Sequence, residues 1–170
     1  MGGVFGDRAI ELGGIVARPD SQMRGVGQLM LQAYMRSVEQ NLITAHTRNP
    51  AILRMLANVC GRASVYPLNS TGFVGPDYNF VGRITNHPDS DVARSIPHTT
   101  VDGRDVAYHV NRYGDDGLYG PLSDDPADRP AHKGSPTTLK ERYPGLEHKG
   151  TALVVVADYT ETRAGQGGTA

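Results

Sequence analysis

The sequence predicts an α/β fold: a mixed sheet with a parallel strand pair flanked by helices, followed by a loop-rich C-terminal half. Strand-like and helix-like patterns alternate twice within about the first 60 residues, which is typical of a βαβα unit with parallel strands. Most of the 21 Gly and 11 Pro then fall between residues 61 and 150. Long loops are therefore expected there, with one legible strand, before a last apolar strand.

The first strand is expected within residues 8–18, which lead into a turn at residues 19–21. A helix should follow from Val26 to about Gln40, because apolar residues recur there at spacings of three and four. These residues lay one stripe along the helix, and they are Leu29, Met30, Ala33, Tyr34 and Val38.

A short strand at residues 42–46 and a second helix complete the unit. Asn49 can cap this helix, Pro50 suits its first position and Gly61 stops it. Its apolar stripe consists of Ile52, Leu53, Leu56, Val59 and Cys60. Cys60, the single cysteine, is expected to be a buried small hydrophobic residue rather than a nucleophile.

Two strands are legible farther along the chain. Residues 105–112 place Val106, Tyr108 and Val110 on one face, and residues 151–157 contain a Leu-Val-Val-Val run expected to lie centrally in the sheet. All these elements are expected to form one domain over residues 1–160. Its expected parts are a core at residues 1–61, a loop-rich insertion at residues 62–150 and a final strand at residues 151–157. A disordered tail is expected after the domain, at residues 161–170.

Composition limits the function classes. The formal net charge is −1 and no basic stripe is visible, which argues against a general nucleic-acid or anionic-membrane surface. No apolar run approaches the roughly 18 residues needed to span a bilayer, and no signal-peptide pattern opens the sequence. A cytoplasmic protein is therefore expected.

Two glycines, Gly25 and Gly27, lie where the first strand turns into the first helix. Free backbone N–H groups and the positive end of the helix dipole meet at such a corner, which favours a phosphate. Residues without a side chain let a pyrophosphate approach the backbone closely. The sequence has neither the Lys-Ser/Thr pair of a P-loop nor the third spaced glycine of a dinucleotide fingerprint.

The remaining pattern, Gln22-Met23-Arg24-Gly25-Val26-Gly27, resembles the acetyl-CoA loop of the GNAT superfamily of N-acetyltransferases. That motif is Gln or Arg, two residues, Gly, one residue, then Gly or Ala. The resemblance covers roughly residues 8–61 and makes residues 1–61 the acyl-CoA-binding core. It implies cofactor contacts from the N–H groups of Gln22 to Gln28, from the backbone of Ile15, Val16 and Ala17, and from Asn49, which also reads as an ordinary cap.

The resemblance implies direct attack of a primary amine on acetyl-CoA, held by the protein as a co-substrate. Glu11 is then the expected general base, although it also reads as a solvent-facing strand residue. The family's usual acid is a tyrosine in the second helix, but residues 55–57 supply no hydroxyl. Tyr66 is the candidate replacement, with simple packing as its other interpretation. The rival hypothesis is a non-catalytic CoA-binding module or a subunit of a larger assembly.

The family normally places further strands and helices before the strand that begins here near Arg8. An exposed sheet edge is therefore expected, with a homodimer or a partner chain pairing on it. His87, His98 and His109 recur every eleven residues, but spacing alone does not show convergence, and no metal site is expected.

Overall fold

The computed structural model describes residues 9–13, 25–68, 98–101, 104–110, 112–114 and 125–166. The strands are β1 (Ala9–Leu12), β2 (Leu42–Thr47), β3 (Val65–Tyr66), β4 (His98–Val101), β5 (Arg104–His109) and β6 (Ala152–Asp158). The helices are α1 (Val26–Ser37), α2 (Pro50–Cys60), α4 (Leu139–Arg142) and α5 (Thr160–Gln166). Short 3-10 turns span Arg62–Ser64, Pro126–Asp128 and Pro144–Glu147.

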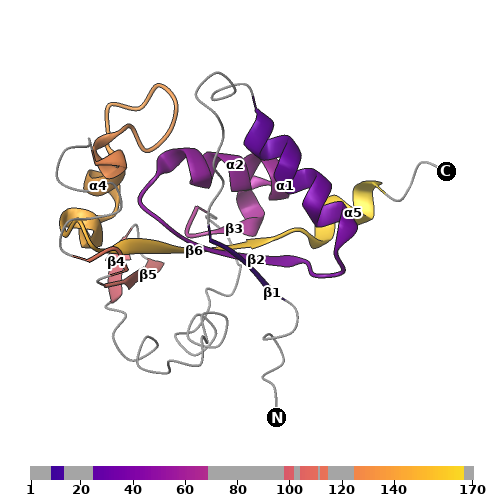
Figure 1. Cartoon of the computed structure of the whole chain (residues 1–170). Coiled ribbons are helices and arrows are strands. Elements are labelled where there is room, and N and C mark those ends of the chain that lie inside the picture. The colour runs from indigo at the N-terminus through magenta and orange to yellow at the C-terminus, as the bar shows by residue number, and fades with distance from the viewer. Residues whose placement is uncertain are drawn as a thin grey trace, which may run out of the picture.

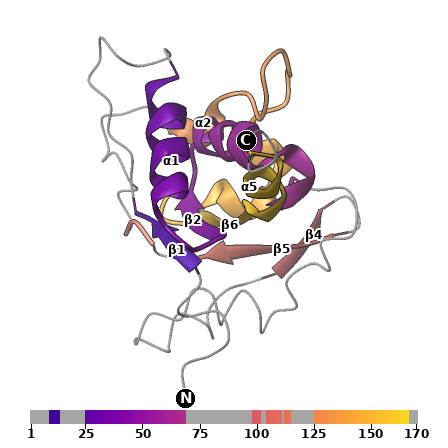
Figure 2. The same ribbon diagram turned by 90° about the vertical axis from the view of Figure 1, so that its right-hand side faces the viewer.

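The strands form a mixed sheet in the order β1-β2-β6-β5-β4, and β3 also pairs with β6. Helices α1, α2 and α5 lie together on one face of this sheet (Figures 1 and 2). The predicted fold class, a mixed sheet with a parallel strand pair flanked by helices, is confirmed. No helix in the described part of the chain is long and apolar enough to cross a membrane.

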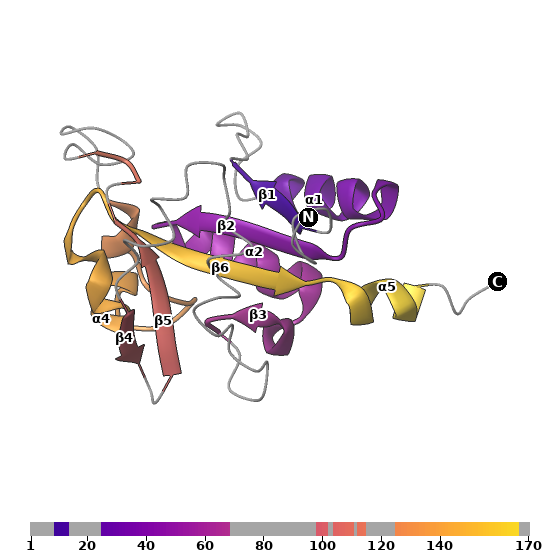
Figure 3. The ribbon, with the colours of Figure 1, turned by 90° about the horizontal axis from the view of Figure 1, so that it is seen from below.

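The last strand, β6, lies in the middle of the sheet, as the sequence predicts. It pairs antiparallel with the whole of β2, from Leu42↔Asp158 to Thr47↔Leu153. Its other edge is shared by β5, near the start of β6, and β3, near its end (Figure 3). Residues 152–157 are all buried. Branched residues suit such a position because they pack well on a pleated surface covered on both faces.

Strands β1 and β2 are parallel neighbours, with the register running from Ala9↔Leu42 to Leu12↔Ala45. This confirms the predicted direction of the pair. Among the described residues, this pairing runs as far as Leu12, and β2 itself continues to Thr47. The described strand is shorter than the predicted range 8–18, because Gly13 already lies outside it and residues 14–24 are outside the described residues.

Helix α2 matches its prediction at both ends. The Asn49 side chain accepts a hydrogen bond of 2.9 Å from the Ala51 N–H, Pro50 occupies the first turn, and Gly61 follows the helix with φ 84°. An N-cap bond of this kind satisfies a donor that the helix itself leaves unpaired. Cys60 is buried as expected, and burial raises the pKa of its thiol to about 12, so it stays uncharged and unreactive.

Helix α1 packs with a different face from the predicted apolar stripe. Leu31 and Met35 are its buried residues, whereas Leu29, Met30 and Tyr34 are 64%, 54% and 48% exposed. The helix is apolar on two sides, so periodicity alone does not decide which side meets the core. The helix also ends at Ser37 rather than near Gln40.

The two faces of α1 predict opposite results for two leucine truncations. Leu31→Ala is expected to lower the free energy of unfolding by about 2–3 kcal/mol, because it empties buried volume. Leu29→Ala should change it by less than about 0.5 kcal/mol, because that side chain is exposed. Urea unfolding of both variants measures the difference. A larger loss for Leu29→Ala would contradict the observed packing.

The segment from Asp125 to Gly150 is more ordered than the predicted loop-rich insertion. Helix α4 begins with a capping box between Thr138 and Glu141, a feature the sequence analysis missed. The segment buries five side chains in the main core, and these are Ala127, Ala131, Leu139, Tyr143 and Leu146. A Cβ at Gly145 would lie 2.6 Å from the Tyr108 ring, so only glycine fits there.

Arg48, the residue after β2, anchors this segment from inside the core. Its side chain is 1% exposed and pairs with both carboxylate oxygens of Asp125. The guanidinium also donates to three backbone carbonyls, those of Leu146, His148 and Thr151. Burial alone would raise the pKa of Asp125, but hydrogen bonds from Arg48 and from the Ala127 N–H outweigh it and lower that pKa.

Residues 160–166 form α5, so the prediction of a disordered tail is wrong for Glu161–Gln166. Residues 167–170 lie outside the described residues. The Arg163 guanidinium lies 5.6 Å from the Tyr159 ring centroid and donates to carbonyls at the end of α1. These acceptors are Met35, Val38, Glu39 and Gln40 at 2.6–3.0 Å. Arg163 thereby satisfies carbonyls that α1 leaves without helical partners.

Candidate functional site: an acid-histidine cluster and an open helix corner

The two faces of the sheet carry different chemistry. Side chains alternate along a strand, so Ile43 and Ala45 point into the core beneath the helices, whereas Thr44 and His46 point to the other face. Glu11 pairs in register with Thr44 and shares that second face. The ionisable residues of β1 and β2 are therefore kept away from the apolar core.

Four residues from three strands and the turn after β5 meet on this second face. Glu11 Oε1 lies 3.5 Å from His46 Nδ1 and 3.3 Å from Arg112 Nη2. The rings of His46 and His109 meet edge to face with centroids 4.9 Å apart. We call Glu11, His46, His109 and Arg112 the acid-histidine cluster.

Burial differs within the acid-histidine cluster. The side chain of His46 is 7% exposed, whereas that of Glu11 is 43% exposed. No described residue hydrogen bonds to either ring nitrogen of His46 or to Nδ1 of His109. Buried polar atoms without partners cost about 1–3 kcal/mol each, so such atoms are typical of a place that a ligand completes.

Burial sets the charge of the histidines. The pKa of His46 is lowered from 6.5 to about 4, chiefly by burial and also by the nearby His109 and Arg112, against the opposing effect of Glu11. Burial and Arg112 also lower the pKa of His109. Both imidazoles are therefore neutral near pH 7, and each offers one donor and one acceptor beside the Glu11 carboxylate.

Tyr113 holds the turn after β5 against β2. Its hydroxyl donates to the His46 carbonyl at 2.8 Å, and its backbone N–H donates to the Gly150 carbonyl at 3.1 Å. Arg112 precedes Tyr113 and is thereby kept within reach of Glu11. Sequence analysis missed His46, although its position two residues after Thr44 in an alternating strand indicates that it faces away from the apolar side.

The lowered pKa of His46 predicts a loss of stability in acid. The unfolded chain binds a proton below pH 6.5, whereas folded His46 binds one only near pH 4. Stability is thus full above pH 6.5 and falls by about 3 kcal/mol as the pH drops to 4. His46→Asn should reduce this dependence in urea unfolding at pH 7.5 and 4.5, while the exposed control His132→Asn should not. If the stability of His46→Asn depends on pH as strongly as that of the unaltered protein, the lowered pKa of His46 is not the cause of the acid sensitivity.

Among the described residues, no atom fills the space beside Gly25 at the predicted helix corner. Gly25 precedes α1 with φ 75°, a conformation that favours glycine, and a Cβ built there meets nothing within 4 Å. No side chain caps α1, and no acidic residue lies in its first turn. Within the described residues, no carboxylate of α1 itself therefore competes for its first N–H groups, from Val26 onward, which suits an anion site.

The other predicted cofactor contacts have mixed outcomes. Asn49 is the N-cap of α2, which agrees with its interpretation as an ordinary cap. Gln28 accepts a 3.3 Å hydrogen bond from Asn58 of α2. Gly27 lies in the first turn of α1. Six predicted contacts lie outside the described residues, and these are Ile15, Val16, Ala17, Gln22, Met23 and Arg24.

Tyr66 lies on the same face of the sheet as the acid-histidine cluster, opposite Val156. Its hydroxyl accepts a 2.8 Å hydrogen bond from the Ala107 N–H of β5. This contact joins β3 to β5 along the edge of β6 that they share, and it gives the residue a structural role. Of the evenly spaced histidines, His87 lies outside the described residues, and His109 belongs to the cluster. No group of described His, Cys, Asp or Glu side chains is arranged to hold a metal ion.

No family model, curated protein or solved structure matches this chain.

Proposed function

We propose that this protein is an N-acetyltransferase that transfers an acetyl group from acetyl-CoA to a primary amine. The observation that carries the proposal is the parallel pair β1–β2 joined through α1, which opens at an uncapped glycine corner. The motif at this corner resembles the acetyl-CoA loop of the GNAT superfamily.

In the proposed site, the first N–H groups of α1 and the loop before it hold the pyrophosphate. The backbone N–H groups of Gly25, Val26 and Gly27 supply hydrogen bonds, and the helix dipole supplies positive potential. Ile15, Val16 and Ala17 belong to the same proposal, as the backbone that pairs with pantetheine. The Ile15 N–H would stabilise the oxyanion formed when the amine attacks the thioester carbonyl.

Glu11 is the proposed general base. The amine nitrogen attacks the thioester carbon, Glu11 takes the proton that the nitrogen loses, and the carbon–sulfur bond breaks to release the CoA thiolate. Neutral His46 borders this carboxylate and can accept or donate a hydrogen bond to the amine without adding charge. Tyr66 is the other proposed catalytic residue from the sequence, but its hydroxyl is held by a strand N–H, so our proposal rests on Glu11.

The alternative function is a CoA-binding module that does not catalyse transfer. This alternative is favoured by α2, which carries Met55, Leu56 and Ala57 where the GNAT family has the tyrosine that acts as general acid. Acetyl-CoA titration followed by measurement of thiol release with a panel of amines separates the two functions. Amine-dependent thiol release supports the enzyme, whereas binding without release supports the module.

Gly25→Val tests the cofactor corner itself. We expect acetyl-CoA affinity, measured by calorimetry, to fall about tenfold or more, because a branched side chain covers the N–H groups. Gly134→Val is a matched control: Gly134 has φ 81°, open space around its Cβ position and a place outside the corner. Both variants carry similar backbone strain. Equal affinity in the two variants would count against both proposed functions.

The proposal also includes the expected cytoplasmic location and the expected pairing of β1 with another chain. Within the described residues, β1 pairs with β2 alone, and α1 lies beside it (Figure 2).

A further inference from the structure

The carboxylate and the guanidinium of the acid-histidine cluster lie side by side at the surface. The side chains of Glu11 and Arg112 are 43% and 39% exposed, and Glu11 Oε1 lies 3.3 Å from Arg112 Nη2. Helices α1, α2 and α5 cover the opposite face of the sheet (Figure 1). An exposed ion pair of this kind adds little to stability, so a ligand can replace part of it at small cost.

Both groups keep unused hydrogen-bonding capacity. One hydrogen bond joins them, from Arg112 Nη2 to Glu11 Oε1, and neither side chain forms another with a described residue. A guanidinium carries five N–H donors, and a carboxylate has two accepting oxygens. Each group can therefore bind a second group of opposite charge, and the two binding positions are adjacent.

His46 adds a buried polar edge beside this ion pair. Its Nδ1 lies 3.5 Å from Glu11 Oε1, its side chain is 7% exposed, and neither ring nitrogen has a hydrogen-bond partner among the described residues. Buried nitrogens without partners indicate a place where a hydrogen-bonding ligand binds. The ring is neutral near pH 7, since burial lowers its pKa to about 4, so it leaves the charges of Glu11 and Arg112 balanced.

The guanidinium limits which amines can bind at Glu11. An ammonium on this carboxylate also lies close to the Arg112 guanidinium, and two cations at such a distance repel each other. A carboxylate on the same ligand offsets the repulsion by forming paired hydrogen bonds with the guanidinium. In an α-amino acid a single carbon separates the ammonium from the carboxylate, which suits partners that are 3.3 Å apart.

We propose that the acid-histidine cluster binds an α-amino acid, with the ammonium on Glu11 and the carboxylate on Arg112. Its role as the acetyl acceptor rests on the proposed acetyltransferase function, whereas its binding can be measured without acetyl-CoA. In the reaction, the ammonium gives one proton to water, the amine nitrogen attacks the thioester carbon, and Glu11 takes a second proton. The carbon–sulfur bond breaks, and the products are an N-acetyl amino acid and the CoA thiolate.

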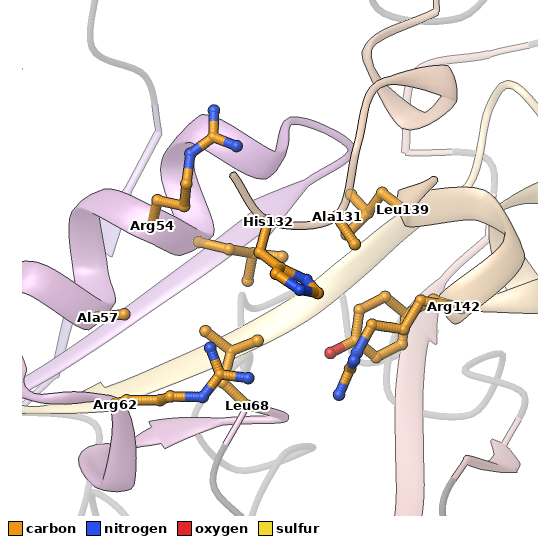
Figure 4. Close-up of a pocket in the computed structure, with 10 residues that line it drawn as sticks. Arg54, Ala57, Arg62, Leu68, Ala131, His132, Leu139 and Arg142 are labelled. Atoms are coloured by element: carbon orange, nitrogen blue, oxygen red, sulfur yellow. The ribbon is translucent and has the colours of Figure 1, made fainter. Parts of the chain in front are cut away.

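The binding test uses L-alanine as the probe and the full chain labelled with ¹⁵N in its histidine rings. We expect L-alanine to shift the His46 signals, which are identified by their loss in His46→Asn. The His132 signals should not move, because His132 borders a pocket that shares no residue with the cluster (Figure 4). L-alaninamide lacks the carboxylate and L-lactate lacks the amine, so each should bind about tenfold more weakly.

Arg112→Gln tests the position of the carboxylate. It should weaken L-alanine binding about tenfold without weakening L-alaninamide binding, because only L-alanine loses a charge-assisted contact. Arg112 is exposed, so the variant should keep the fold, and Arg129→Gln makes the same charge change at an exposed position outside the cluster. A selective loss in Arg112→Gln supports the proposal. Three results would overturn it: no shift at His46, equal affinity for the three probes, or equal loss in Arg129→Gln.

Thiol release separates this inference from the proposed function. With acetyl-CoA present, Arg112→Gln should lower kcat/KM for L-alanine about tenfold without lowering it for L-alaninamide. If the variant changes both values equally, the acetyltransferase function stands and the amino-acid inference fails. If L-alanine binds but no amine releases thiol, the acetyltransferase function fails and the amino-acid site stands.

Discussion

Replacement of Arg48 by methionine is expected to lower the free energy of unfolding by about 3–5 kcal/mol, because it removes the hydrogen-bonded partner of the buried Asp125 carboxylate and leaves only Lys140, 3.8 Å away. The same change removes the Arg48 hydrogen bonds to three buried carbonyls, those of Leu146, His148 and Thr151. A lysine ammonium lacks the planar guanidinium group that donates to Asp125 and to all three carbonyls, so Arg48→Lys should also be destabilising. Urea unfolding at pH 7 measures both losses.

Two further variants separate the ion pair from simple packing. Arg36→Met removes an exposed arginine from α1 and should change stability by less than about 0.5 kcal/mol. The double variant Arg48→Met with Asp125→Leu should recover part of the loss, because no unpaired charge remains. A loss below about 1 kcal/mol in Arg48→Met would show that the buried contacts do not hold the C-terminal segment to β2.

Glu11→Gln is expected to reduce acetyl transfer by about 10²–10⁴-fold with acetyl-CoA affinity nearly unchanged. The amide keeps the size and polarity of the carboxylate but accepts no proton at neutral pH. The effect should appear in kcat rather than in the affinity for acetyl-CoA, because the proposed cofactor contacts lie at the α1 corner and on the backbone. Steady-state thiol release, with calorimetry for binding, distinguishes these outcomes.

The control for Glu11 is Glu39→Gln, which changes the same group at an exposed position after α1. It should leave turnover within about twofold of the unaltered protein, because the residue touches no proposed reactant. Circular dichroism of both variants checks that loss of the Glu11 contacts with His46 and Arg112 has not unfolded the sheet. Equal turnover in the two variants would remove Glu11 from the mechanism.

Local signals predicted most of the framework. The second helix could be placed at both ends because Asn49, Pro50 and Gly61 act on the backbone within a few residues. The β6 strand could be placed in the middle of the sheet because an uninterrupted run of apolar branched residues is typical of a strand buried on both faces. The packed face of α1 could not be predicted, since Leu29 and Leu31 are equally apolar and only the sheet distinguishes them.

Only part of the candidate site could be predicted, because contacts between segments distant in sequence leave no local signal. Glu11 was identified by its place on the first strand, whereas its neighbours His46 and His109 are distant in sequence. They meet because β6 holds β2 and β5 on opposite edges, a pairing that no local pattern specifies. Arg48 was overlooked for a similar reason: its carboxylate partner, Asp125, lies in a segment whose glycines and prolines indicated only loops.

The position of β6 has a consequence for how the protein forms during translation. Its residues 152–158 are made late, yet they join β2, β3 and β5. Until they leave the ribosome, the backbone N–H and C=O groups of β2 that pair with β6 face water, and the sheet cannot close. Contacts between such distant segments slow folding and favour aggregation in the interval. Synthesis of this chain should therefore depend on chaperones that shield β2 until its partner strand arrives.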